Sequence, residues 1–383
     1  MSPRAETRLG ARIRAVEAIP LRIPFRRSFT MATAQEPTRE HVDVLVVRIT
    51  AEDGRIGLGE TQAWRRQGSG ETLPSLFAKV RDVATPLMVG RSALDFGVLL
   101  SELDQRLAGN LYVQAALGDA LYDLAARCLD LPVHDLLGGR FREEIPVGLA
   151  IGISGDEAGM VRAAEEAVER GYRHIRIKIG LDAAKDLRCA TALRKRFGDS
   201  LVLRADANGG MNYGDALRLL SKLEPLGFEI VEQPVPGWDL EGMAALARAV
   251  RIPLSADESV TSAHSLVEVA KRGAARVFQS KTAKNGGLHH IRRLWSLAET
   301  LGIGIFPGNH PSTGLNVAAV AHLAAAWPGE LLVGDFQTGC DDMIAEDILQ
   351  EPVRIAGGKV TVPQGPGFGV QLDEAKLRKF RWE

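Results

Sequence analysis

The spacing of hydrophobic and polar positions changes along this chain and divides it into two units. From residue 146 onward, short apolar runs alternate with longer stretches in which apolar residues recur at helical spacing. The apolar runs are predicted strands near 146–151, 173–179, 201–206, 228–232, 252–256, 276–281, 303–307 and 331–335. Eight strands with about seven helices between them predict an α/β fold with strict strand–helix alternation.

The residues before this region follow a different pattern. Alternation over 12–22 predicts a strand, and 41–60 predicts a β-hairpin that turns at Glu52-Asp53-Gly54. Three helical stretches follow, around 71–88, 94–107 and 111–129. Strands followed by a block of helices are typical of an α+β unit. We expect this unit to span 1–140 and the alternating unit to span 141–349. The tail, 350–383, contains two short predicted strands, and we expect it to return to the N-terminal unit.

Composition and charge narrow the classes of function. The 383 residues are 45% hydrophobic and 25% charged, as in a globular protein with a large core, and the net charge of −1 gives no reason to expect nucleic acid or an anionic membrane as partner. Three cysteines far apart match no metal spacing or disulfide framework, which favours a reducing cytoplasm. No apolar run is long enough for a signal peptide or a membrane span, so we expect a cytoplasmic protein.

Polar groups stand at the ends of five successive predicted strands. They are Arg-Ile-Lys (176–178), Asp-Ala-Asn (206–208), Glu-Gln-Pro (232–234), Asp-Glu-Ser (257–259) and Ser-Lys (280–281). Lys178, Asp206, Glu232, Asp257 and Lys281 follow one another at intervals of 24 to 28 residues. A (β/α)₈ barrel uses about 250 residues for eight units, and its strands all end at one rim. The spacing therefore predicts that these five side chains meet in one cavity.

Three of these residues are carboxylates on neighbouring strands. Asp206, Glu232 and Asp257 offer hard oxygen ligands, which are too few for an all-protein calcium site. They suit Mg²⁺, with Mn²⁺ as the alternative, because these ions leave coordination positions for water and substrate oxygens. Asn208 shares a strand face with Asp206 and is expected beside this site.

The two lysines are expected on opposite sides of the carboxylates. A lysine is a useful base only when burial or a neighbouring cation lowers its pKa. Arg176 lies on the same strand face as Lys178 and can supply that cation. Lys284 could do the same for Lys281, although we expect it in the following loop.

The motifs together resemble those of the enolase superfamily. The segments that carry the resemblance are Arg-Ile-Lys, Asp-Ala-Asn-Gly-Gly, Val-Glu-Gln-Pro, Ala-Asp-Glu-Ser and Lys-Thr-Ala-Lys-Asn-Gly-Gly. They are most similar to the muconate-lactonizing-enzyme subgroup of the mandelate racemase/muconate lactonizing enzyme family. This resemblance implies a (β/α)₇β TIM-like barrel under an α+β capping domain formed by the N-terminal segment and the C-terminal tail. It also implies a homo-oligomer that acts on a small-molecule carboxylate.

The resemblance assigns roles residue by residue. It implies that Asp206, Glu232 and Asp257 bind Mg²⁺ and that Lys178 and Lys281 are the acid/base pair. Such sites abstract an α-proton and stabilise the resulting enediolate with the metal. Arg176, Asn208 and Glu258 are expected to bind substrate or to support these groups.

This chain departs from the subgroup in two places. Arg176 replaces the usual first lysine of the Lys-x-Lys motif and cannot act as a base. Asp335-Phe336-Gln337 replaces the Asp-x-Asp of dipeptide epimerases, which makes dipeptide specificity doubtful. His310 follows the seventh strand, as the catalytic histidine of mandelate racemases does. Its usual aspartate partner is replaced by Lys281, so we expect a role for His310 in substrate shape or structure.

Two segments of the N-terminal unit are expected near the barrel mouth. Arg65 and Arg66 follow the predicted hairpin and are candidates for holding an anionic group of the substrate. Residues of the segment 25–29 are candidates for the same role.

These observations favour an isomerase: a racemase, an epimerase or a muconate-type cycloisomerase. A lyase that dehydrates a β-hydroxy acid through the same enediolate is the alternative. A binding protein without catalysis is disfavoured because all five core positions are filled.

Overall fold

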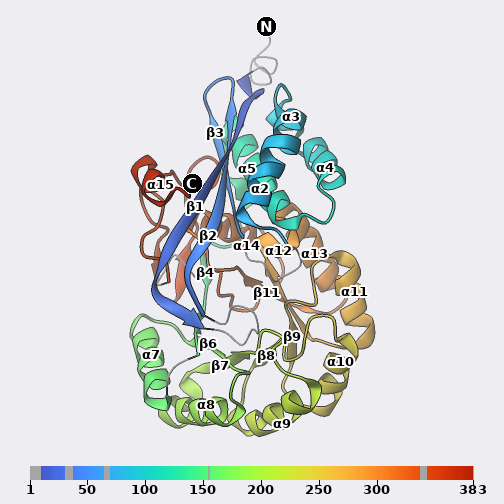
Figure 1. The fold of residues 1–383 in the computed structure, drawn as a ribbon, viewed down its shortest axis with the longest axis vertical. Coiled ribbons are helices and arrows are strands. Elements are labelled where there is room, and N and C mark those ends of the chain that lie inside the picture. Colours follow the sequence, from blue (N-terminus) through green and yellow to red (C-terminus); the bar gives the residue numbers. More distant parts are fainter. Residues whose placement is uncertain (1–9, 31–37, 64–69, 154–155, 337–342, 383) are drawn as a thin grey trace.

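The structure, a computed structural model, describes residues 10–30, 38–63, 70–153, 156–336 and 343–382. It has a three-stranded antiparallel sheet with helices at one end and a curled parallel sheet surrounded by helices at the other (Figure 1). The mixed α/β fold expected from the sequence is confirmed.

The N-terminal sheet has the order β1 (Ile13–Thr30), β2 (Thr38–Ala51), β3 (Ile56–Gln62). β1 extends past the predicted end at residue 22, although Pro20 and Pro24 interrupt its pattern. Both prolines are tolerated because β1 is an edge strand, where a missing N–H need not break the ladder. β2 and β3 form the predicted hairpin, and Gly54 adopts a φ of 87° in its turn.

Helices cover one face of this sheet. They are α2 (Leu73–Lys79), the π-helix η1 (Val80–Ala84), α3 (Thr85–Met88), η2 (Ala93–Asp95), α4 (Phe96–Arg106), α5 (Leu111–Cys128) and α6 (Val133–Leu136). The predicted helix over 71–88 is interrupted by η1, next to Pro86, whose missing N–H disturbs the helical ladder. α5 packs directly on β3. The approach is so close that a Cβ on Gly59 would lie 2.0 Å from the Ala116 carbonyl oxygen, so only glycine fits there.

The parallel sheet has seven strands in the order β11-β10-β9-β8-β7-β6-β5. They are β5 (Leu149–Ile151), β6 (His174–Lys178), β7 (Val202–Asp206), β8 (Ile230–Glu232), β9 (Leu254–Ala256), β10 (Val277–Lys281) and β11 (Gly304–Gly308). Between and outside them lie α7 (Glu157–Glu169), α8 (Ala183–Phe197), η3 (Gly198–Ser200), α9 (Tyr213–Leu223), η4 (Glu224–Leu226), α10 (Leu240–Ala249), α11 (Ala263–Arg272), α12 (Thr282–Asn285), α13 (Leu288–Thr300) and α14 (Gly314–Ala325).

The expected first and last strands of this unit differ from the prediction. The run 146–151 is split into β4 (Glu144–Pro146), which leaves the sheet, and β5. The run 331–335 is an extended segment: Leu332 N donates to Ile305 O at 2.9 Å, and Gly148 N donates to Gly334 O at 2.7 Å. This segment therefore bonds to both edges of the parallel sheet.

The C-terminal tail contacts both parts of the molecule. β12 (Ile355–Ala356) and β13 (Lys359–Thr361) form a small antiparallel sheet with β4. α15 (Glu374–Phe380) lies beside β1, and Trp382 N donates to Pro20 O at 3.0 Å. The boundaries of the two expected domains stay a prediction.

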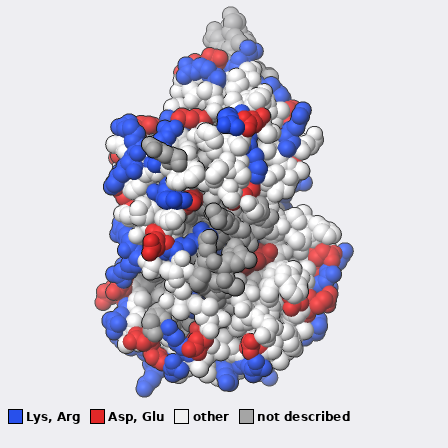
Figure 2. Space-filling model, in the orientation of Figure 1, with Lys and Arg blue, Asp and Glu red and all other residues white. Residues whose placement is uncertain are grey.

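Positive and negative side chains are interspersed on the face that Figure 2 shows. Among the described residues, no helix combines the length and apolarity that a membrane crossing requires.

Candidate active site

A row of charged side chains crosses the carboxyl ends of three adjacent strands. Lys178 of β6 is in register with Asp206 of β7, and Asp206 is in register with Glu232 of β8. All three side chains are buried. Because the strands are parallel, their carboxyl ends lie at one edge of the sheet. Residues in register on neighbouring strands share the same phase of the pleat, so these three side chains point to the same face.

Lys178 and Asn208 surround one end of this row. Lys178 Nζ donates to Asp206 Oδ2 at 2.5 Å and to Asn208 Oδ1 at 3.0 Å. Asn208 N donates to Asp206 Oδ1 at 2.8 Å, and Asn208 Nδ2 donates to Glu258 Oε1 at 3.3 Å. Asn208 has a φ of 46°, a left-handed conformation that asparagine tolerates better than most residues. Two of the three supporting residues expected from the sequence, Asn208 and Glu258, therefore contact each other beside the row.

Lys281 lies at the other end. Its Nζ donates to Asp257 Oδ2 at 2.5 Å and lies 4.0 Å from Glu232 Oε1. The five residues expected to converge do so, with one lysine against Asp206 and the other against Asp257.

Arg176 is bound by three carboxylates. Its Nη1 lies 3.2 Å from Asp206 Oδ2 and also contacts Glu232, and its Nη2 lies 2.5 Å from Asp335 Oδ2. These carboxylates raise the pKa of Arg176 although burial alone would lower it. The sequence predicted that the positive charge of Arg176 lowers the pKa of Lys178. In the structure, three carboxylates neutralise that charge.

Burial raises the pKa of every carboxylate in the site, but the net shifts differ in direction. It raises the pKa of Asp206, but Lys178 and Arg176 more than offset this and hold it below its ordinary value. Burial and the neighbouring Asp206 and Asp257 raise the pKa of Glu232 well above its ordinary value. Burial, with Asp257 and Asp206, raises the pKa of Glu258 to about 7.

The lysine on β10 does not behave as expected. Burial lowers the pKa of Lys281, but Asp257 and Glu232 more than offset it, so the pKa lies above its ordinary value. The prediction that Lys284 lies in a loop is also wrong. Lys284 belongs to α12 and is completely buried. Its ammonium donates to the backbone carbonyls of Asp257, Val260 and Gln279 at 2.8 to 2.9 Å, which compensates the loss of contact with water.

The donor set fits a hard divalent cation. Glu232 Oε1 is buried and accepts no hydrogen bond from any described residue, as expected of an oxygen that serves another ligand. The described residues form no group of three acidic, imidazole or thiol side chains arranged as metal ligands. Each of the three carboxylates instead contacts a cation: Glu232 contacts Arg176, Asp206 contacts Lys178 and Asp257 contacts Lys281. Asp206, Glu232 and Asp257 are the residues that could hold such an ion.

Sequence reasoning missed the residue that aligns Asp257. Gln233 Oε1 accepts from Asp257 N at 3.0 Å and from Ser259 N at 3.1 Å, while Gln233 Nε2 donates to Val235 O at 2.9 Å. Gln233 thus ties the end of β8 to the end of β9. The sequence signal for Gln233 was its position in the Glu-Gln-Pro motif. The direction of its side chain could not be read from the sequence.

The other candidates lie at the edge of this cluster or outside the described residues. His310 is buried after β11, its ring centroid 5.9 Å from that of Tyr112; burial, then Lys281, holds its pKa well below the ordinary value. Arg65, Arg66 and Gln337 lie outside the described residues. Arg26, from the segment 25–29, donates through Nε to Ile344 O at 3.0 Å.

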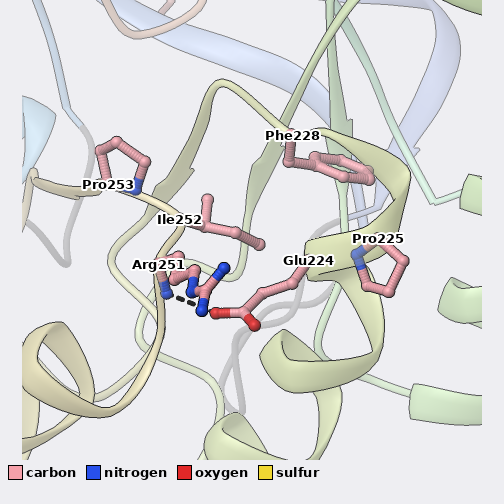
Figure 3. Close-up of a pocket in the computed structure, with 6 residues that line it drawn as sticks. All are labelled: Glu224, Pro225, Phe228, Arg251, Ile252 and Pro253. Carbon is pink, nitrogen blue, oxygen red and sulfur yellow. Dashed lines mark hydrogen bonds between the residues drawn. The ribbon is translucent and has the colours of Figure 1, made fainter.

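One surface pocket can be set aside. It has a volume of about 410 Å³ and lies at the amino ends of β8 and β9 (Figure 3). Arg251 N donates to Glu224 Oε1 across it. Active sites of parallel barrels lie at the opposite, carboxyl ends of the strands. This pocket is therefore not the candidate site.

Comparison with known proteins decides the family. Residues 12–138 match the mandelate racemase/muconate lactonizing enzyme N-terminal domain, and residues 159–376 match the enolase C-terminal domain-like family. The chain belongs to the mandelate racemase/muconate lactonizing enzyme family.

Members of this family resemble the chain over almost its whole length. Muconate cycloisomerase 1 of Rhodococcus opacus is 34% identical and covers 93% of both chains. L-Ala-D/L-Glu epimerase of Bacillus subtilis is 30% identical, over 92% of this chain and 94% of its own. The structure of a muconate lactonizing enzyme from Pseudomonas fluorescens, complexed with muconolactone, superposes with a TM-score of 0.92 at 30% identity, over 97% of this chain and all of that one. The expected enzyme class, isomerase, is confirmed.

Proposed function

We propose that this protein is a Mg²⁺-dependent isomerase that removes and returns the α-proton of a small carboxylate. One observation carries the proposal: Lys178 and Lys281 contact opposite ends of the set Asp206–Glu232–Asp257. Two proton carriers on two sides of one site suit racemisation or epimerisation, and they also suit a muconate-type cycloisomerisation. The names of the relatives support both reactions.

The metal has a limited and definite part in this proposal. When bound by Asp206, Glu232 and Asp257, Mg²⁺ supplies Lewis-acid stabilisation of negative charge on the substrate carboxylate. The burial of all three ligands favours this role, because charge interactions are stronger where water is excluded.

The lysines carry the proton. Lys281, which contacts Asp257, donates the proton in one direction. Lys178 acts as the base in that direction, and the roles reverse in the other. Arg176 keeps positive charge beside Lys178 without competing as a base, since a guanidinium stays protonated.

We also propose that residues 1–140 and 350–383 form a capping domain over a barrel of residues 141–349. The contacts of α15 and Trp382 with β1 support this division. Arg65 and Arg66 stay candidates for contact with an anionic part of the substrate.

A substrate screen in D₂O tests the function. Purified protein with Mg²⁺ is incubated with N-acylated amino acids, dipeptides, sugar acids and cis,cis-muconate, and the products are followed by proton NMR and chiral chromatography. Exchange of an α-proton, inversion of configuration or formation of a lactone supports the proposal. A dehydrated product would instead identify a lyase, and the absence of any exchange across the panel would contradict the proposed function.

A further inference from the structure

The guanidinium of Arg176 links two sides of the curled parallel sheet. Its Nη1 contacts Glu232, the last residue of the central strand β8, and its Nη2 lies 2.5 Å from Asp335 Oδ2. Asp335 ends the extended segment 331–335, which bonds to both edges of the sheet. All three side chains are buried. One side chain from β6 therefore joins a candidate metal ligand to an acid on another side of the sheet.

Asp335 is itself held in place by β10 and β11. Its N–H donates to Pro307 O at 3.1 Å, and Gln279 Nε2 donates to its Oδ1 at 3.3 Å. Gly308 leaves room for this carboxamide, because a Cβ there would lie 2.8 Å from Gln279 Nε2. Gln279 thus binds one oxygen of Asp335 and Arg176 the other, so the carboxylate has a defined direction.

An arginine at position 176 suits this arrangement better than the lysine that usually begins the Lys-x-Lys motif. A guanidinium presents two Nη atoms in a rigid plane and can donate to two carboxylates that lie in different directions. A lysine carries all its N–H donors on one atom. The exchange of lysine for arginine therefore lets one side chain bind Glu232 and Asp335 together.

Arg176 contacts one oxygen of Glu232 and leaves the other. Oε2 contacts Arg176 Nη1, while Oε1 accepts no hydrogen bond from any described residue and lies 4.0 Å from Lys281 Nζ. Asp335 neutralises part of the guanidinium charge and binds its Nη2. Without Asp335, more of that charge would act on Glu232 and Asp206 and would repel a bound cation, strongly so in a buried site.

We propose that Asp335 is a positioning residue of the metal site: it holds and neutralises Arg176, so that Arg176 fixes Oε2 of Glu232 and leaves Oε1 for the divalent cation. Indirect partners of this kind orient metal ligands and tune their affinity. The inference rests on the proposed function, because it concerns the metal ion that the proposed isomerase uses.

Asp335→Asn tests the proposal, since it keeps the size of the side chain and removes its charge. In an EPR titration of chelator-treated protein, this variant should bind Mn²⁺ about tenfold more weakly than wild type. Gln279→Met removes the donor to Asp335 but keeps the charge, and it should weaken Mn²⁺ binding about threefold. This second variant decides the point if Asp335→Asn does not fold. Unchanged Mn²⁺ affinity in the folded variants would overturn the inference.

A double-mutant cycle distinguishes positioning from direct attraction between Asp335 and the cation. In the proposal Asp335 acts through Arg176. In Arg176→Met protein, Asp335→Asn should therefore change the Mn²⁺ affinity by less than about twofold. A tenfold loss in that background as well would show that Asp335 attracts the cation by its own charge, and the positioning role would be wrong.

Glu229→Gln is the control for the loss of a carboxylate from a guanidinium pair. Glu229 pairs with Arg204, whose Cζ lies 4.8 Å from the centroid of the Phe306 ring, and Arg176 Cζ lies 5.9 Å from the same centroid. We expect Glu229→Gln to leave the Mn²⁺ affinity within about twofold of wild type. Equal losses in Glu229→Gln and Asp335→Asn would overturn the positioning role.

The titration also separates this inference from the proposed function. If wild type binds Mn²⁺ and Asp335→Asn binds it equally well, only the inference is overturned. If wild type binds no Mn²⁺, the metal dependence in the proposed function is wrong and the inference is overturned with it.

Discussion

Lys178 and Lys281 each donate to a different carboxylate at 2.5 Å: Lys178 to Asp206 and Lys281 to Asp257. Glu232 lies on the strand between those two acids, so the lysines approach the site from opposite sides. This arrangement predicts that each lysine serves one configuration of the substrate.

The lysines should therefore be separable by isotope exchange. In D₂O, Lys178→Ala should still exchange the α-proton of the isomer that faces Lys281, and Lys281→Ala should exchange only the opposite isomer. Neither variant should interconvert the two, and overall isomerisation should fall by about 10²- to 10⁴-fold. Proton NMR over hours measures both quantities. Full two-way isomerisation by Lys281→Ala would show that the two-base mechanism is wrong, and His310 would be tested next.

Metal binding should depend on Glu232. Chelator-treated protein should lose activity and regain it with Mg²⁺ or Mn²⁺. Glu232→Gln should bind Mn²⁺ at least about tenfold more weakly in an EPR titration, since even indirect partners of metal ligands typically matter that much. Glu229→Gln is the control, because Glu229 pairs with Arg204 just before β8. Equal Mn²⁺ affinities in the two variants, or full activity in metal-free protein, would contradict the metal site.

Lys284 should be important for stability. Lys284→Met removes the ammonium that binds three backbone carbonyls and leaves Asp257 with one cation fewer. Breaking a buried charged contact on one side typically costs about 3–5 kcal/mol. Urea unfolding should report a loss of that order, whereas Lys271→Met on α11, where the side chain is 69% exposed, should change stability by less than about 0.5 kcal/mol. A loss as small as that of Lys271→Met would refute the structural role.

Acid stability should depend on His322. Burial, then His134, lowers the pKa of His322 to about 3, while an unfolded histidine has a pKa of about 6.5. Between these values the unfolded chain binds a proton that the folded chain does not, so the unfolding free energy falls as the pH falls, by at most about 1.4 kcal/mol per pH unit. His322→Asn retains an acceptor for the His134 N–H and should weaken this pH dependence.

Unfolding by urea at pH 7.5 and pH 5 measures the effect. His264→Asn on the exposed side of α11 is the control and should leave the pH dependence of wild type unchanged. An unchanged slope in His322→Asn would show that other groups cause the acid sensitivity.

The sequence by itself determined the order of the elements and the convergence of the site. Regular spacing was enough for Lys178, Asp206, Glu232, Asp257 and Lys281, because parallel strands end at one rim whatever their loops contain. It also predicted the N-terminal hairpin, since an Asp-Gly turn between alternating segments is a local signal.

Only the tertiary structure decided which groups pair inside that rim. Arg176 binds Asp335, more than 150 positions away, and Glu60 caps a helix that begins at Gly314. Such contacts depend on side-chain direction and on segments brought together by the fold, which no local pattern records. The burial of Lys284 and the raised pKa of Lys281 have the same cause, the side-by-side arrangement of β8, β9 and β10. It surrounds Lys284, expected in a loop from the sequence, with backbone carbonyls. It also places Lys281 beside the carboxylates that raise its pKa.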